Sequence, residues 1–213
     1  MTLWLIAWSA TAAAASLSPP IPNEAAAQEA FTEPALRAEL LALRERDQEL
    51  RRAMIENAED EAILEELRAF DERATARAKE ILAEHGWPSV EEVGVEGSGA
   101  FWLLVQHSVD RDFLAAAISH MEAAAERGDL EPGLVATAID RVRTNRGEPQ
   151  LYGTQFHEVE GELVPYPIED EEHLDERRER MGLGPFEEYR RLLLETYGRT
   201  PKTEAEPGEG GGR

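Results

Sequence analysis

Apolar residues recur at intervals of three and four along most of the chain, which is the spacing of one face of an α-helix. The first such stripe follows Pro34 and comprises Leu36, Leu40, Leu43, Leu50 and Met54. Asp47 falls where this stripe requires an apolar residue. A second helix is expected over about 60–85, because Gly86 and Pro88 end it. The two helices are close enough in sequence to pair antiparallel.

The middle and the end of the chain predict further helices. Residues 100–105 are continuously apolar, which favours a helix buried on most sides. Asp110 opens the next helix, and Gly128 ends it. Three more are expected over about 132–146, from Asp170 to Met181, and after Pro185.

Residues 150–166 break the helical pattern. The segments 150–157 and 162–166 alternate as strands do, and Glu160-Gly161 supplies the turn of a two-residue hairpin. Pro165 and Pro167 prevent the second strand from continuing as a central one. The predicted fold class is therefore all-α, a bundle of about six to seven helices with one appended β-hairpin.

The two ends of the chain are expected to lie outside the domain, which covers 33–198. Residues 3–15 are apolar but too short for a stable membrane anchor, and they lead into A-x-A patterns of the kind found in secretory signals. Residues 1–27 therefore read as a signal peptide, which predicts an exported, periplasmic or secreted protein, or as a disordered leader on a cytoplasmic one. Residues 199–213 are rich in Gly, Pro and Glu and predict a disordered tail.

Composition narrows the classes of partner. The chain has 44 acidic and 22 basic residues and a formal charge of −22, which argues against nucleic acid and anionic membranes. It has no cysteine, which excludes disulfides, thiolate nucleophiles and zinc–thiolate sites. Its five histidines show no metal-binding spacing, so no metal and no cofactor are predicted.

Two segments, DRVRTNRGEPQLYGTQF (140–156) and WLLVQHSVD (102–110), resemble a bacterial family of unknown function. Its members share a D-R-x-x-x-N-x-G-x-x-Q-x-Y-G-T-Q signature and an upstream W-x-x-x-Q-H-x-x-D segment. A D-Q-x-x-R element, here Asp47, Gln48 and Arg51, also matches. The resemblance covers about residues 35–190 and implies a fold and a set of positions, but no activity. Where the family usually has Asn, three residues after the aspartate matching Asp71, this chain has Ala74, which would alter a site that needs the amide.

The candidate site begins with Gln150, Tyr152 and Gln155. A bulge at Gly153 would turn Gln155 toward the other two side chains. Neutral amides and a phenol suit a sugar, a peptide or a carbonyl oxygen better than a metal ion. Alternatively, the glutamines satisfy backbone groups where the hairpin docks on the helices.

The opposite wall of the predicted site comes from the helices. Asp110, or the end of the helix, would orient His107 as a general acid/base; alternatively, Asp110 only caps a helix and His107 only faces a helix dipole. Arg141 and Asn145 share one helix face, and Arg141 would clamp a ligand carboxylate or pair with Asp47.

We therefore expect a polar pocket under the hairpin, lined by Gln106, His107, Asp110, Arg141, Asn145, Gln150, Tyr152 and Gln155. Three functions fit it. The first is binding of a small neutral or weakly anionic ligand, such as a sugar or a peptide. The second is a hydrolase-like acid/base reaction that uses His107 and Tyr152. The third is a structural or interaction role in which the polar residues only hold the hairpin on the bundle.

Overall fold

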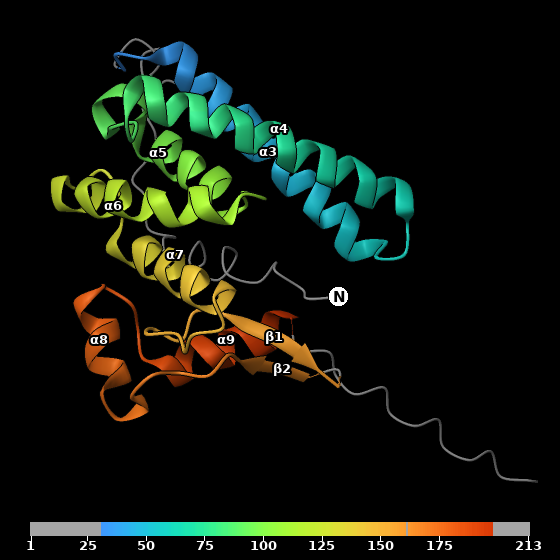
Figure 1. The fold of residues 1–213 in the computed structure, drawn as a ribbon, viewed down its shortest axis with the longest axis vertical. Coiled ribbons are helices and arrows are strands. Elements are labelled where there is room, and N and C mark those ends of the chain that lie inside the picture. Colours follow the sequence, from blue (N-terminus) through green and yellow to red (C-terminus); the bar gives the residue numbers. More distant parts are fainter. Residues whose placement is uncertain (1–30, 161, 198–213) are drawn as a thin grey trace, which may run out of the picture.

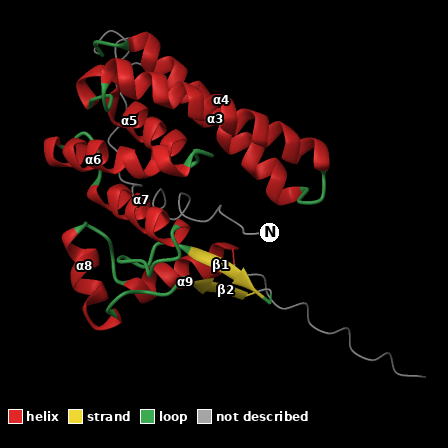
Figure 2. Cartoon of the chain, in the orientation of Figure 1, coloured by secondary structure: helices red, strands yellow, loops and turns green. Residues whose placement is uncertain are grey.

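The computed structural model describes residues 31–160 and 162–197. In this part of the chain it contains seven α-helices, one short 3-10 helix and one antiparallel hairpin, which confirms the predicted fold class (Figures 1 and 2). The predicted leader over 1–27 and the predicted tail over 199–213 lie outside the described residues. None of the described helices has both the length and the hydropathy needed to cross a bilayer.

Five helices build the N-terminal layers of the molecule. They are α3 (Pro34–Glu56), α4 (Glu61–His85), α5 (Val90–Gln106), α6 (Arg111–Arg127) and α7 (Pro132–Asn145). Helices α3 and α4 lie side by side as a long helical hairpin, and α5 packs against both (Figure 1). Helix α6 packs against α7, which in turn borders the C-terminal layer (Figure 1).

Local signals in the sequence set the helix ends. Asp60 accepts hydrogen bonds from the N–H groups of Ala62 and Ile63 and so caps α4. Ser89 and Glu92 form a capping box at the start of α5, which therefore begins earlier than the apolar run suggested. That run, 100–105, is at most 2 % exposed at each residue and forms the centre of the core.

The C-terminal layer consists of the hairpin and the remaining helices. Strands β1 (Phe156–Val159) and β2 (Glu162–Pro165) pair in the register Phe156↔Pro165. The 3-10 helix Glu171–His173 leads into α8 (Leu174–Arg180), and α9 (Phe186–Tyr197) follows. A small second core holds this layer together, with the buried side chains of Phe156 and Leu193 at its centre.

The strands are shorter than the sequence predicted. Residues 150–155 form a loop rather than the first half of a strand, and Gln150 keeps only one parallel bridge, to Ile168. Gly153 adopts a φ of +67°, and a Cβ there would come within 2.7 Å of Phe186, so only glycine fits this turn. Glu160 takes a positive φ in the hairpin turn, as a two-residue turn requires; Gly161 lies outside the described residues.

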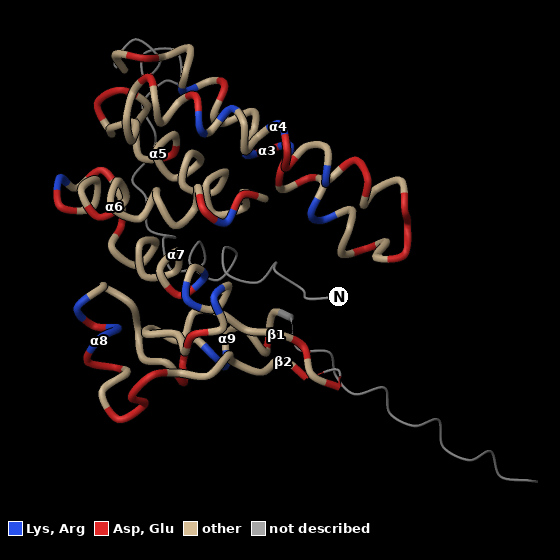
Figure 3. The backbone as a smooth tube through the Cα atoms, viewed as in Figure 1, with Lys and Arg blue, Asp and Glu red and all other residues tan. Residues whose placement is uncertain are grey.

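The acidic residues that the structure describes are distributed over several helices and do not form one charged patch (Figure 3). Figure 3 shows acidic positions along α3, α4 and α8, interspersed with basic ones. Many of these charges form pairs on the surface, such as Arg77 with Glu39. Exposed pairs of this kind contribute little to stability, so these acidic residues act mainly as a solvated surface.

Candidate functional site

Asp140 on α7 organises the loop that carries Gln150, Tyr152 and Gln155. Its carboxylate is 0 % exposed and accepts hydrogen bonds from the N–H groups of Leu151 (2.6 Å), Tyr152 (3.0 Å) and Thr154 (3.0 Å). The hydroxyl of Thr154 donates to the same carboxylate at 2.9 Å. Burial raises the pKa of Asp140, and the N–H groups act against this shift. One buried side chain thus accepts from three backbone N–H groups of the loop.

The two glutamines of the loop are bonded to the protein itself. The amide nitrogen of Gln150 donates to the carbonyl oxygens of Gln155 (3.0 Å) and Tyr166 (2.8 Å), and its oxygen accepts from the N–H of Gln155 (2.8 Å). The amide of Gln155 donates to the carbonyl of Thr137 and to the hydroxyl of Thr154. Both side chains satisfy buried backbone groups where the loop docks on the helices.

Tyr152 and His107 lie among different neighbours. The carbonyl of Tyr152 accepts from Arg178, and its phenol is half-buried. Burial and the charge of Asp140 raise the pKa of Tyr152, with smaller effects from Glu122 on α6 and from two arginines of α8. The charged groups that act on His107 are instead Asp47, Arg51 and Arg141. The structure therefore gives no contact that would let the phenol and the imidazole act together.

His107 belongs to a buried charged cluster built by three helices, which we call the His107 cluster: Asp47 and Arg51 of α3, Asp71 of α4 and His107 at the end of α5. The Nδ1 atom of His107 lies 2.8 Å from Oδ1 of Asp47. Arg51 donates from Nε to the same oxygen at 3.0 Å and from Nη2 to Asp71 at 2.7 Å. The side chain of Asp47 is 1 % exposed, and the other three are between 12 % and 15 % exposed.

The electrostatics of the cluster keep the imidazole of His107 neutral near pH 7. Burial, and next the charge of Arg51, lower the pKa of His107 to about 4, although Asp47 acts in the opposite direction. The ring is therefore neutral near pH 7. Burial raises the pKa of Asp47, but the bonds and charges of His107 and Arg51 outweigh it and the net shift is downward. Nδ1 of His107 lies 2.8 Å from Oδ1 of Asp47, which only accepts, and 2.9 Å from Nε of Arg51, which only donates. The first contact favours a proton on Nδ1 and the second a proton on Nε2.

Asp71 is the second titratable group of the cluster. Burial raises its pKa to about 6, the charge of Asp47 adds to the shift, and Arg51 opposes it. Between about pH 4 and pH 6 folding thus favours the protonated form of Asp71 and the neutral form of His107. Stability falls with rising pH in this window on account of Asp71 and rises on account of His107, so the two effects oppose each other.

Asp71→Asn should unmask the pH dependence that comes from His107. The unfolded chain then takes up a proton below pH 6.5 that the folded chain refuses until about pH 4, so stability should rise from pH 4 to 6.5. The slope relative to wild type should approach about 1.4 kcal/mol per pH unit. Urea unfolding at pH 4.5, 5.5 and 6.5 measures it. Parallel profiles for variant and wild type would show that Asp71 does not titrate in this window.

Further polar side chains lie near the end of α5, in the last turns of α7 and on β1. We call them the polar junction, which comprises Gln106, Arg141, Asn145 and His157. Arg141 donates to the carbonyl of Gln106 at 3.2 Å, and Asn145 follows one turn later on α7. Burial and the charge of Arg51 lower the pKa of Arg141 to about 10, while Tyr166 opposes this shift. The ring of Tyr166 in turn packs against His157, with 4.3 Å between their centroids.

The polar junction holds buried polar atoms that find no partner in the described part of the chain. They include both the oxygen and the nitrogen of the Gln106 amide, on a residue that is 2 % exposed. Oδ1 of Asn145 and Nδ1 of His157 are also buried and have no hydrogen-bond partner among the described residues. Native proteins satisfy almost all buried polar groups, so each of these atoms is a candidate position for a bound water molecule or ligand.

Asp110 lies on the surface, apart from the polar junction. Its carboxylate caps α6 by accepting from the N–H groups of Asp112 and Phe113, and Lys79 donates to it at 2.6 Å. The group that orients His107 is Asp47, in place of the proposed Asp110. Asp47 is also bonded to Arg51, the arginine of the D-Q-x-x-R element, while Arg141, the partner proposed from the sequence, donates to the backbone of Gln106.

The structure adds Asp47, Arg51, Asp71 and His157 to the residues that the sequence proposed. Asp47 carried a signal, because an acid in an apolar stripe needs a buried partner. Asp71 and His157 carried none, since only tertiary packing brings Asp71 to Arg51 and buries Nδ1 of His157. Ala74, one turn after Asp71, is buried in the core. Among residues 31–160 and 162–197, no three His, Cys, Asp or Glu side chains converge as a metal site would require.

The chain also matches a known protein family. A family model described as "Family of unknown function (DUF6624)" matches residues 34–202. No curated protein and no solved structure matches the chain. The matched range contains both the His107 cluster and the polar junction, and the family description assigns no activity to either.

Proposed function

The chain belongs to a family of unknown function, DUF6624, so we propose its function from its own geometry: the polar junction binds a small neutral or weakly anionic ligand. The observation that carries this proposal is the buried, unpartnered amide of Gln106. A buried polar group without a partner costs about 1–3 kcal/mol. A bound ligand with a donor and an acceptor would recover this energy.

The contrast between two glutamines supports this reading. Gln106 and Gln150 are almost equally buried, at 2 % and 0 % exposed. Gln150 is bonded through both atoms of its amide, as a residue with a structural role should be. Gln106 is bonded through neither, although a polar side chain at that depth has no advantage over leucine for packing.

The chemistry of the polar junction limits the ligand. Amide and imidazole groups offer neutral donors and acceptors, which suit the hydroxyl groups of a sugar or the amide groups of a peptide. Arg141 and the neighbouring Arg51 add positive potential, which tolerates one weak negative charge. The ligand is therefore a small polar molecule of low charge.

A second candidate function rests on His107. The 2.8 Å contact of its Nδ1 with Asp47 has the arrangement in which a carboxylate orients an imidazole for general acid/base catalysis. A ring that is neutral at pH 7 has one unprotonated nitrogen and can accept a proton there. In this second candidate function, the residue that acts together with His107 is Asp47 rather than Tyr152. The third function, a purely structural role, accounts for Asp140, Gln150 and Gln155 but leaves the amide of Gln106 unexplained.

The proposal is tested by titrating ¹⁵N-labelled protein with N-acetylglucosamine and with alanyl-alanine. Binding of either probe should shift the side-chain amide resonances of Gln106 and Asn145. Gln106→Leu should weaken the binding of the probe about tenfold, because the lost hydrogen bonds are worth about 1–1.5 kcal/mol. Asn57→Ala, which removes an exposed amide from the far end of α3, should leave binding unchanged. An unchanged affinity of Gln106→Leu for the probe, or no shift with either probe, would contradict the proposal.

A further inference from the structure

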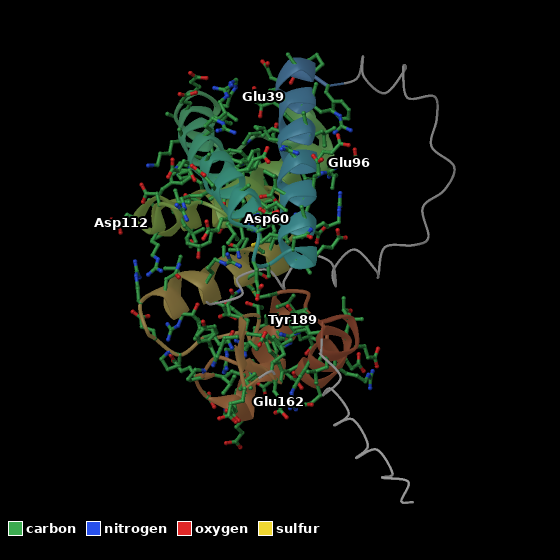
Figure 4. All side chains as sticks on the ribbon, turned by 90° about the vertical axis from the view of Figure 1, so that its right-hand side faces the viewer. Glu39, Asp60, Glu96, Asp112, Glu162 and Tyr189 are labelled. Atoms are coloured by element: carbon green, nitrogen blue, oxygen red, sulfur yellow. The ribbon has the colours of Figure 1, made fainter. Side chains whose placement is uncertain are left out.

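A cavity of about 460 Å³ lies between α7 and α9, apart from the His107 cluster. Residues 182–185, which connect α8 to α9, form one wall, and Thr154 of the loop held by Asp140 forms part of another. Its volume is in the range of cavities that hold small organic ligands. Tyr189, which also lines it, lies in the C-terminal layer close to the boundary with α7 (Figure 4).

Arg178 of α8 supplies a cation to the wall of this cavity. The residue is 2 % exposed, and its guanidinium donates to the carbonyl oxygens of Gly184 (2.7 Å) and Tyr152 (2.6 Å). It also lies over the rings of Phe186 and Tyr189, at 5.8 and 5.1 Å from their centroids. These bonds fix the plane of the guanidinium and leave its Nη2 group for a further acceptor.

The charge of Arg178 is not matched by an ion pair within the described residues. Burial lowers the pKa of Arg178, while Tyr189, Asp175 and Asp140 act in the opposite direction. Both of these aspartates are already engaged: Asp175 accepts from the N–H of Phe186, and Asp140 accepts from the loop. A buried cation bonded only to neutral carbonyls is costly, and a carboxylate would neutralise it through charge-assisted hydrogen bonds.

The rest of the cavity is mainly apolar. The side chains of Leu134, Leu183 and Leu192 line it together with the indole of Trp102, whose N–H is directed to the carbonyl of Leu134 at 3.0 Å. This leaves the faces and edges of hydrophobic groups toward the cavity, which favours an aliphatic or aromatic tail.

The polar residues at the rim restrict the ligand further. Glu188 and Glu195 lie there with Arg191, and all three are exposed. Arg191 lies 4.0 Å from Glu195, so one carboxylate of the rim stays without a cationic partner among these three. A second negative charge on a ligand would meet this excess of negative charge.

We propose that the cavity between α7 and α9 binds a small monocarboxylic acid, with its carboxylate on the guanidinium of Arg178 and its apolar part against Trp102, Leu134 and Leu183. This site is distinct from the polar junction and does not depend on the function proposed for it. The ligand class follows from one buried cation, apolar walls and an acidic rim.

The test uses three probes of equal chain length with the full-length protein: octanoate, octanamide and suberate. Octanoate should bind and should shift the backbone amide resonances of Gly133, Leu183 and Gly184. Octanamide, which lacks the charge, and suberate, which carries a second one, should bind at least about tenfold more weakly. Equal affinity for octanoate and octanamide, or shifts at other positions, would overturn the proposal.

Two variants of α8 complete the test. Arg178→Met should reduce the affinity for octanoate about tenfold or more. Arg180→Met is the matched control, because Arg180 is 71 % exposed on the same helix and should leave binding unchanged. If Arg178→Met fails to fold, the comparison of the three probes on the wild-type protein still decides. Unchanged octanoate binding by a folded Arg178→Met variant would overturn the proposal.

Discussion

Replacing Asp140 by alanine should lower the free energy of unfolding by at least about 3 kcal/mol. The carboxylate accepts from three backbone N–H groups and one hydroxyl in the loop 151–154. Each buried donor that loses its acceptor costs about 1–3 kcal/mol, and alanine offers no replacement. Because the same loop leads into β1, the hairpin and α9 should lose their packing on α7 together with it.

Urea unfolding followed by circular dichroism measures this loss. Asp140→Asn should lie between wild type and alanine, because it keeps one acceptor oxygen but places an NH₂ group against N–H donors. Asp112→Ala is the control for loss of an aspartate: its side chain projects outward from α6, and its removal should change stability by less than about 0.5 kcal/mol (Figure 4). A loss below about 1 kcal/mol for Asp140→Ala would show that the loop does not depend on it.

Arg51→Ala should cost about 3–5 kcal/mol at pH 7. It removes the cation that bonds both Asp47 and Asp71, and the side chain of Asp47 is 1 % exposed. An ionised carboxylate at that depth without a cationic partner is strongly unfavourable. The loss should be smaller at pH 5, where protonation of Asp71, whose pKa is already about 6, relieves part of the repulsion between the two acids.

The neighbouring residue gives a matched control. Arg52 is exposed on the same turn of α3, and Arg52→Ala should change stability by less than about 0.5 kcal/mol. Adding Asp47→Leu to Arg51→Ala should restore part of the loss, because it removes the stranded charge. If the double variant is as unstable as the sum of the single ones, the ion pair is not the cause.

The helices could be predicted because their signals are local. The spacing of apolar residues, the prolines at the starts of α3 and α7, and the caps Asp60 and Asp110 all lie within a few residues of the ends that they set. The loop at 150–155 could not be predicted in the same way. Its alternating sequence is typical of a strand, but the carboxylate of Asp140 takes its N–H groups out of any sheet.

The candidate site was only partly accessible from the sequence for a related reason. Asp47 was visible as an acid in an apolar stripe, but the sequence paired it with Arg141, whereas the structure pairs it with Arg51. Asp71 reaches the cluster only through the packing of α3 on α4. The sequence proposed Gln106 and Gln150 alike as residues that line the pocket. Which of the two is bonded depends on atoms far away in sequence, such as the carbonyl of Tyr166.

The most direct test of the account compares the unfolding free energies of Gln106→Leu and Gln150→Leu. Leucine has nearly the size of glutamine, so packing changes little in either case. Gln106→Leu should leave stability unchanged or raise it, because it removes an amide that the folded protein does not satisfy. Gln150→Leu should cost about 2 kcal/mol or more, because it strands the N–H of Gln155 and the carbonyl of Tyr166 and removes one of the two donors to the carbonyl of Gln155. Equal losses in the two variants would contradict a ligand site at the polar junction and would make Gln106 a structural residue like Gln150.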